Sequence, residues 1–229
     1  MTEWQAQQPR LFGRRLGRPL RVRKTALLET LLPRLQLTLP ERGFAEPKSW
    51  FATPPRDIWL EIGFGGGEHL AAQAAQNPNI GFIGCEPFRN GVASLLDHID
   101  RQGLGNIRIQ PDDARPLLAA LLPASLARVF ILFADPWPKK RHAERRFVQQ
   151  ATLGALARVM QPDARLRLAT DDPVLQEWTT VQMRATPLFV PEFGDGISTQ
   201  RPADWVVTRY EEKALQARRT PLYYCFKKG

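Results

Sequence analysis

The sequence predicts an α/β fold with a doubly wound parallel sheet and an antiparallel C-terminal hairpin. From residue 57 on, short apolar runs alternate with longer amphipathic stretches, which is typical of βα units that wind a parallel sheet. Beyond residue 185 the apolar runs leave no room for a full helix before each of them, which favours hairpin strands. We therefore expect a Rossmann-like arrangement in a single domain over residues 26–229, because 229 residues with 43% hydrophobic content can enclose one core.

The expected elements follow in order along the chain. A leucine-rich helical segment over residues 27–35 ends before the break at Pro54 and Pro55. Parallel strands are expected at residues 58–62, 81–85, 107–110, 129–133 and 165–169. Amphipathic helices are expected at about 68–76, 90–101, 114–122, 144–159 and 173–185. Residues 189–190, 206–208 and 223–226 are expected to be the short strands of the C-terminal region.

The first 25 residues are expected to form a flexible basic arm. They are rich in arginine and glycine and nearly free of acidic residues, so they cannot build a core. The arm is either a solvated tail or a segment that follows phosphates, and the formal net charge of +9 favours a polyanionic partner such as nucleic acid. An anionic membrane is the competing partner. No apolar run is long enough to span a bilayer and no signal-peptide core is present, so we expect a cytoplasmic protein without membrane association.

Cysteine and histidine spacing argues against a metal site or a disulfide. Cys85 and Cys225 each lie in an apolar stretch, and His69, His98 and His142 have no partners at ligand spacing. We therefore expect no bound metal and two buried free thiols.

A glycine-rich turn follows the first strand, with Glu61 ahead of Gly63, Gly65 and Gly67. In a doubly wound sheet this turn lies at the ligand-binding edge, and glycine lets the backbone approach a ligand closely. A dinucleotide-binding fingerprint would place its third glycine where Glu68 stands, which counts against a pyrophosphate ligand. A carboxylate at Glu61 would repel phosphate but would pair with the ammonium group of S-adenosylmethionine.

Acidic residues follow the second and third strands. Glu86 is placed to accept both hydroxyl groups of a ribose, although this feature alone suits NAD equally well. Asp112 and Asp113 follow the third strand, where an acid can bind an adenine amino group or cap the next helix. For Asp113 we favour binding over capping.

The most specific segment follows the fourth strand and reads Asp135-Pro136-Trp137-Pro138, continuing with Lys139, Lys140, Arg141 and His142 and then Arg145 and Arg146. The prolines stiffen the loop, so Asp135 and Trp137 are expected at the mouth of the cofactor cleft. An aromatic side chain beside a cluster of cations can stack on a base and pair with phosphates. A solvated loop with a core tryptophan is the alternative.

This segment resembles the hallmark DPWxKxRHxxRR of the tRNA (guanine-N7-)-methyltransferase family. The resemblance extends from about residue 10 to residue 226 and includes LEIGFGGGE, GCEPFRNGV, ATDD at 169–172 and the segment that begins at Thr208. It implies a class I S-adenosylmethionine-dependent methyltransferase that modifies N7 of guanine 46 in the variable loop of tRNA. Glu144 is a departure, because a cation often stands there in the family.

The resemblance also implies residue roles. The cofactor role falls to Glu61, Glu86, Asp113 and Asp135, with the glycine loop, and Asp135 is the leading candidate for the catalytic positioning residue. The substrate role falls to Lys139, Asp171, Thr208, Arg209, Tyr210 and Glu211, and the cations Arg141, Arg145 and Arg146 are expected to contact phosphates. Asp171 has an alternative role as the cap of a helix that begins at Pro173.

Three rival functions remain open. An NAD-dependent dehydrogenase is the nearest in fold, and a methyltransferase of exocyclic amino groups is nearest in chemistry, although in its usual loop an aromatic residue follows the second proline. A non-catalytic RNA-binding protein is the third. The sequence leaves the choice between a monomer and a homodimer open.

Overall fold

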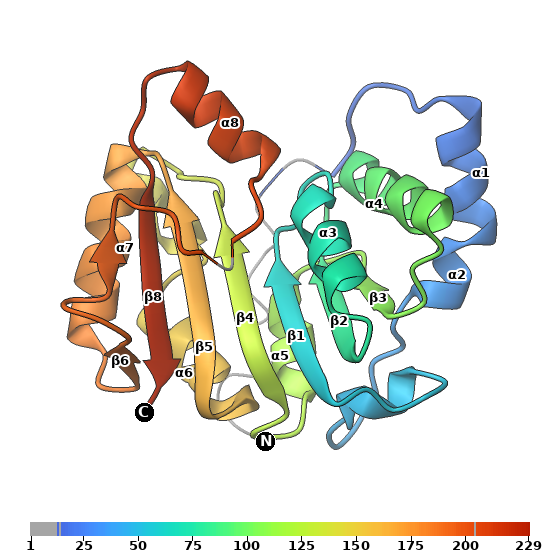
Figure 1. Cartoon of the computed structure of the whole chain (residues 1–229), viewed down its shortest axis with the longest axis horizontal. Coiled ribbons are helices and arrows are strands. Elements are labelled where there is room, and N and C mark those ends of the chain that lie inside the picture. The colour runs from blue at the N-terminus through green and yellow to red at the C-terminus, as the bar shows by residue number, and fades with distance from the viewer. Residues whose placement is uncertain (1–12, 14, 204) are drawn as a thin grey trace.

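The structure, a computed structural model, describes residue 13, residues 15–203 and residues 205–229. Its centre is an eight-stranded sheet with the order β3-β2-β1-β4-β5-β8-β6, in which β7 pairs with β8 (Figure 1). The strands are β1 (Asp57–Ile62), β2 (Ile80–Cys85), β3 (Ile107–Gln110), β4 (Leu126–Leu132), β5 (Met160–Thr170), β6 (Phe189–Pro191), β7 (Ile197–Ser198) and β8 (Leu222–Lys228).

The register confirms the predicted topology. β1 to β5 pair in parallel, whereas β8 runs antiparallel to β5, β6 and β7. The strand order changes direction at β1. The chain first continues from β1 to β2 and β3 on one side, and β4 and β5 then lie on the other side of β1. In doubly wound sheets such a switch point opens a crevice at the carboxyl ends of the strands.

Helices cover both faces of this sheet (Figure 1). They are α1 (Val22–Thr30), α2 (Leu32–Leu35), α3 (Glu68–Gln76), α4 (Arg89–Gln102), α5 (Ala114–Ala120), α6 (Gln150–Val159), α7 (Pro173–Ala185) and α8 (Arg209–Gln216), with short 3₁₀ helices at Pro47–Trp50 and Lys140–Arg145. One core cluster joins α1, α3 and α4 to the sheet, and another joins α5, α6 and α7 to it. Both cysteines are buried and free. Within the described residues, no helix combines the length and the apolar character that crossing a membrane requires.

Two expected elements differ from the structure. The helix expected at 144–159 begins only at Gln150, because Gln149 and Thr152 form a reciprocal capping box there. The strand expected at 206–208 is absent, because Thr208 instead caps α8, a helix that the apolar pattern did not indicate. The hydroxyl of Thr208 accepts the backbone N–H of Glu211 at 3.0 Å.

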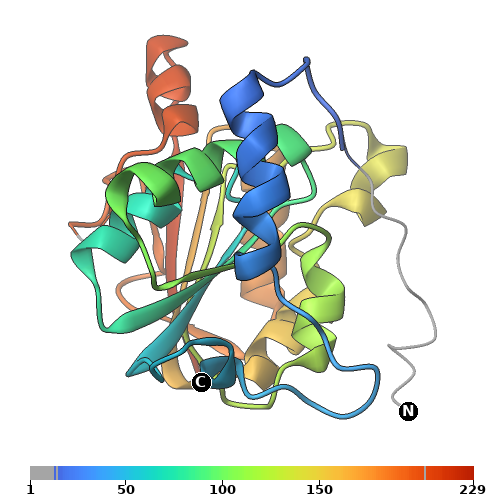
Figure 2. The same ribbon diagram turned by 90° about the vertical axis from the view of Figure 1, so that its right-hand side faces the viewer.

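The structure describes only part of the basic arm expected over residues 1–25. Residues 1–12 and 14 lie outside the described residues, so flexibility there stays a prediction. From Arg15 the chain lies along α4, where Asn90 accepts the N–H of Gly17 at 2.9 Å and donates to the carbonyl of Arg18 at 2.8 Å. Helix α1 already begins at Val22 and stands against α4 (Figure 2). Residues 15–25 are therefore packed on the domain.

Candidate functional site

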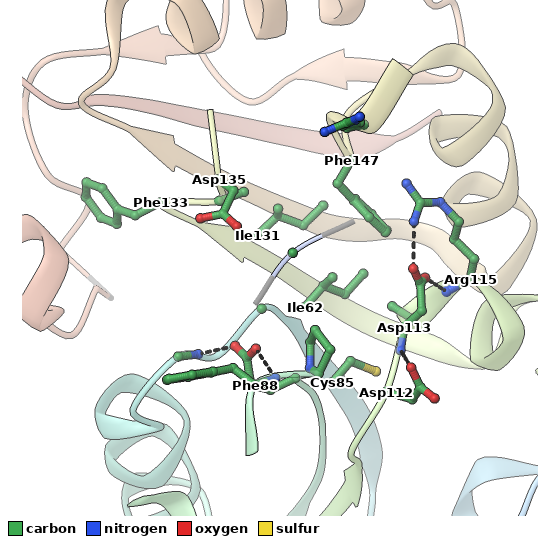
Figure 3. A pocket seen from close by; sticks show the side chains of 18 of the residues that line it. Ile62, Cys85, Phe88, Asp112, Asp113, Arg115, Ile131, Phe133, Asp135 and Phe147 are labelled. Carbon is green, nitrogen blue, oxygen red and sulfur yellow. Dashed lines mark hydrogen bonds and ion pairs between the residues drawn. The ribbon is translucent and has the colours of Figure 1, made fainter. Parts of the chain in front are cut away.

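A cavity of about 300 Å³ opens at the carboxyl ends of the central strands. Figure 3 shows Ile62, Ile131 and Phe147 between Asp135 on one side and Asp113 with Arg115 on the other. The loops after β1, β2, β3 and β4 all contribute to its wall. The cavity therefore lies at the switch point that the topology defines, with an apolar middle and acidic ends.

The glycine loop after β1 forms one wall of the cavity. Gly63 and Gly65 line it, and both adopt positive φ values of 75° and 56°. Gly91 at the start of α4 is equally constrained, since a Cβ there would lie 2.2 Å from the Gly65 carbonyl oxygen. Gly67 does not line the cavity, and its missing Cβ makes room for Leu95 of α4.

Glu86 lies at the edge of the cavity with only 8% of its surface exposed. Its carboxylate accepts the N–H of Gly65 at 2.8 Å and the N–H of Phe88 at 2.9 Å. Burial raises the pKa of Glu86 and outweighs these two hydrogen bonds, and the charges of Asp135 and Glu61 raise it further. The residue thus ties the glycine loop to the segment after β2 and stands where the sequence places a ribose ligand.

Glu61, for which the sequence predicts a cofactor role, does not line the cavity in this structure. Its carboxylate lies 2.7 Å from Nδ1 of His69, and both side chains are almost fully buried. The His69 ring packs edge-on against Phe130 at 4.9 Å and lies near Trp205. The strand alternation explains the difference, because Glu61 and Ile62 point to opposite faces of the sheet and Ile62 is the one that lines the cavity.

Asp113 lines the cavity and also caps α5, so its position fits both the binding role and the capping role. One carboxylate oxygen accepts the N–H of Arg115 at 2.8 Å, and the other pairs with the Arg115 guanidinium at 2.7 Å. Asp112 accepts the N–H of Asp113 and pairs with Arg15 at 3.0 Å. The Arg115 guanidinium stacks in turn on Phe147, at 5.2 Å from the ring centroid.

The loop after β4 presents Asp135 and Trp137 to the cavity. The Asp135 side chain is exposed, and no hydrogen bond to it is present within the described part of the chain. Phe133 and Trp137 have positive φ values of 52° and 44°, which residues with a Cβ rarely adopt. His142 packs edge-on against Trp137 at 5.8 Å. The loop therefore holds an available carboxylate beside an aromatic ring, as the prolines predicted.

The cations of this segment divide into different groups. Lys139, Lys140 and Arg141 are exposed, as expected for residues that meet phosphates. Arg145 lines the cavity, with its guanidinium 5.1 Å from the centroid of the Trp137 ring. Arg146 is only 5% exposed and donates to the backbone of the loop instead. The phosphate contact predicted for Arg146 does not fit this position.

His142 lies among these cations. Desolvation lowers the pKa of His142, and the charges of Arg145, Arg141 and Lys139 lower it further. Its imidazole is therefore neutral at physiological pH, and the positive charge of the segment comes from the lysines and arginines.

The C-terminal segment contributes one residue to the cavity directly. Tyr210, on the first turn of α8, lines it, and a Cβ on Gly65 would lie 2.9 Å from the Tyr210 ring. Burial raises the pKa of Tyr210, and the negative charges of Glu86 and Asp135 add to the effect. Arg209 beside it is exposed.

Glu211 and Asp171 make internal contacts that the sequence did not indicate. The carboxylate of Glu211 is 1% exposed and accepts from Trp205 at 3.1 Å and from Tyr223 at 2.7 Å. Asp171 pairs with Arg219 at 2.5 Å, whereas Asp172 is the residue that caps α7. Both carboxylates therefore fasten the segment around α8 in this structure.

Sequence reasoning missed the apolar wall of the cavity and the partners of the acidic residues. Ile62, Ile131 and Phe147 carry no polar signal, and the spacing of His69 in the sequence gives no sign of its contact with Glu61. In the part of the chain that the structure describes, His, Cys, Asp and Glu side chains form no group of three or more that could hold a metal ion.

Comparison with known proteins places these features in a family. The family model described as "Putative methyltransferase" matches residues 55–223. A tRNA (guanine-N(7)-)-methyltransferase of Paramagnetospirillum magneticum is 48% identical over 97% of this chain and 94% of the relative. A protein of the same name from Rhodospirillum rubrum is 47% identical over 100% of this chain and 91% of the relative.

Solved structures agree on the fold. The crystal structure of the 16S rRNA methyltransferase KamB covers 82% of this chain and 95% of its own, with a TM-score of 0.55 and 16% sequence identity. An antibiotic-related methyltransferase gives the same TM-score at 15% identity, covering 76% of this chain and 89% of its own. The fold is thus that of class I methyltransferases. On the strength of the near full-length identity to its curated relatives, the chain belongs to the tRNA (guanine-N(7)-)-methyltransferase family.

Proposed function

We propose that this chain transfers a methyl group from S-adenosylmethionine to N7 of guanine 46 in the variable loop of tRNA. The observation that carries the proposal is the loop after β4, which presents Asp135 and Trp137 at the cavity with exposed cations next to them. The names of the relatives support a guanine N7 in tRNA as the acceptor. The position within the tRNA follows from the family resemblance of the loop.

The residues of the cavity fit S-adenosylmethionine. Ile62, Ile131 and Phe147 give a flat apolar space for an adenine ring. Each oxygen of Glu86 accepts one backbone N–H and retains a lone pair, so the carboxylate can still accept ribose hydroxyl groups. Asp113 borders the adenine end of this space, and Asp135 supplies negative charge at the other end. Glu61 contacts His69 through one carboxylate oxygen and does not line this cavity, so its role toward the ammonium group stays a prediction.

The chemistry requires positioning more than proton transfer. The cofactor supplies an electrophilic methyl group on a sulfonium. Guanine N7 has an in-plane lone pair and no proton, so no general base is required. The chain must hold the purine in line with the methyl group, and such alignment alone can supply about 7–11 kcal/mol of the barrier. Trp137 and Tyr210 offer aromatic faces at the cavity for this purpose.

Charge is the second contribution of the chain. The purine gains positive charge as the N7–methyl bond forms, and a fixed carboxylate nearby stabilises that charge more in the transition state than in the ground state. Asp135 suits this role because it is directed to the cavity and has no hydrogen bond within the described residues. We therefore propose Asp135 as the catalytic residue.

The exposed cations Lys139, Lys140 and Arg141 would pair with tRNA phosphates beside the cavity. Arg145, Arg209 and Tyr210 complete the proposed substrate surface, because they lie at or next to the cavity mouth. A target base that is stacked in the folded tRNA must be extruded, at a cost of a few kcal/mol. We expect the protein to act in the cytoplasm without metal or membrane, as a monomer or a homodimer.

The direct test is incubation of the protein with unmodified tRNA and S-adenosylmethionine labelled in the methyl group. We expect label in the tRNA, and no label with Asp135→Ala. Parallel titrations with S-adenosylmethionine and NAD separate the proposal from a dehydrogenase. Binding of NAD alone, or cofactor binding without any transfer to tRNA, would contradict the proposed function.

A further inference from the structure

Arg146 occupies an unusual place for a cation in a segment that faces RNA. Its guanidinium donates from Nε to the carbonyl of Pro136 at 3.1 Å and from Nη2 to the carbonyl of Trp137 at 3.0 Å. The same group lies over the Trp178 ring, 4.7 Å from the centroid. Trp178 is itself fixed, because its Nε1 donates to the carbonyl of Val148 at 2.6 Å. One side chain thus connects the loop after β4 to α7.

Two prolines remove backbone donors from the loop that Arg146 holds. Pro136 and Pro138 have no N–H, so hydrogen bonds that normally close a turn are missing on both sides of Trp137. Trp137 itself has a φ of 44°, a conformation that a side chain with a Cβ disfavours. Arg146 binds the carbonyls of Pro136 and Trp137, which lie on either side of this strained backbone. Without these two hydrogen bonds, the loop would relax away from the geometry that presents Asp135 and Trp137.

We propose that Arg146 is a positioning residue for methyl transfer, which acts by fixing the backbone of Pro136 and Trp137. The kinetic part of this inference rests on the proposed function of the loop. Arg145 lies over the Trp137 ring and lines the cavity. The two adjacent arginines therefore differ in position, since Arg145 borders the cavity and Arg146 is turned to the backbone of the loop.

Only arginine can make the two hydrogen bonds and the contact with the Trp178 ring at the same time. The planar guanidinium donates two hydrogen bonds in a fixed fork and presents a flat face to an aromatic ring. A lysine ammonium has no flat face and, as a compact point charge, does not reproduce the fork across the two carbonyls. A phosphate contact, in contrast, tolerates lysine well, because lysine also binds phosphate as a point charge. Arg146→Lys therefore separates the two roles.

The kinetic experiment compares Arg146→Lys and Arg146→Ala with Arg141→Lys and Arg141→Ala, a matched pair at an exposed cation of the same segment. For both Arg146 variants we expect kcat to fall by about 10- to 100-fold, the loss typical of a misplaced reacting group, with tRNA affinity and its salt dependence unchanged. Arg141→Ala should instead weaken tRNA binding and reduce the salt slope by about 0.7–0.9, and Arg141→Lys should restore it. Rescue of kcat by Arg146→Lys, or a reduced salt slope in Arg146→Ala, would overturn the proposal.

A spectroscopic experiment tests the positioning without reference to activity. The chain has six tryptophans, which can be replaced by 5-fluorotryptophan and observed by fluorine NMR. The Trp137 resonance is assigned from its loss in Trp137→Phe. In Arg146→Lys and Arg146→Ala we expect this resonance to shift and broaden, while those of Trp59 and Trp205 in the sheet region stay in place. An unchanged Trp137 resonance would contradict the inference even if activity is lost.

A second variant keeps the test decisive if the Arg146 variants do not fold. Trp178→Leu removes the ring that holds the guanidinium in place, so both hydrogen bonds to the loop should weaken and the Trp137 resonance should broaden relative to the wild type. An unaffected Trp137 resonance in Trp178→Leu would then overturn the proposal. Failure of the proposed function shows itself differently, as a wild-type protein that transfers no methyl group to tRNA but keeps the Arg146-dependent Trp137 signal.

Discussion

Replacement of Glu86 by glutamine should remove a pH-dependent loss of stability and weaken cofactor binding at the same time. Burial raises the pKa of Glu86 although two backbone N–H groups bind its carboxylate, so ionisation in the folded state carries a net cost. Glutamine has nearly the same shape and removes the charge, but its amide nitrogen cannot accept the second N–H. Relative to the wild type, the free energy of unfolding of Glu86→Gln should therefore rise from acid to neutral pH.

The effect has a definite pH dependence. The folded-state pKa of Glu86 lies above the ordinary value of 4.5, so the stabilisation linked to this group is fully present below pH 4.5 and is lost as the pH rises through the raised pKa. The free energy of unfolding of the variant minus that of the wild type should therefore be lowest in acid and rise toward neutral pH. Urea unfolding at several pH values measures it, with Glu29→Gln on the exposed side of α1 as the control.

Cofactor affinity should fall in the variant. A carboxylate can accept both ribose hydroxyl groups, whereas an amide retains one acceptor oxygen, so one hydrogen bond to a charged group is lost. Such a bond contributes about 1.5–3 kcal/mol, which corresponds to roughly 10- to 150-fold in the dissociation constant. Calorimetric titration with S-adenosylmethionine measures this. Unchanged affinity would remove Glu86 from the binding site, and a free-energy difference between variant and wild type that does not rise from acid to neutral pH would refute the reasoning about its charge.

Three further outcomes follow from the structure. Asp135→Ala should lose methyl transfer with an unchanged melting temperature, because the side chain is exposed; a large drop in melting temperature would show a structural role instead. Tyr223→Phe should lower the free energy of unfolding by about 1–3 kcal/mol, since it removes a donor from the buried carboxylate of Glu211, and an unaffected urea midpoint would argue against that bond. Lys140→Ala should reduce the salt slope of tRNA binding by about 0.7–0.9 with no change in cofactor affinity, whereas an unaltered slope would exclude a phosphate contact.

The sheet could be predicted because its signal is local. Each parallel strand is an apolar run, and the alternation with amphipathic helices follows from burial on both faces. Helix α8 could not be predicted in this way, because only Glu211 and Ala214 of its residues are buried and its start depends on the cap at Thr208. The sequence of residues 144–149 likewise gives no sign that helix α6 begins only after the capping box at Gln149.

The acidic residues of the candidate site could be predicted because they follow the ends of the parallel strands. Glu86, Asp113 and Asp135 follow three strands of one sheet, so their convergence on one cavity is a consequence of topology. The direction in which a side chain points does not follow from the topology. Glu61 and Arg146 carry charges that suggest ligands, but His69 and the loop carbonyls compete for them, and such partners are distant in sequence or belong to the backbone. Charge indicates what a residue can bind, and only the packing around it decides what it does bind.

The most direct test of the whole account is the position of the methyl group in the product. A cationic N7-methylguanine is distinctive, because reduction with borohydride followed by aniline cleaves the RNA chain where it occurs. After reaction of unmodified tRNA with the protein and S-adenosylmethionine, we expect cleavage at guanine 46 of the variable loop. Absence of cleavage there, or methyl label on an exocyclic amine or a ribose hydroxyl, would contradict it.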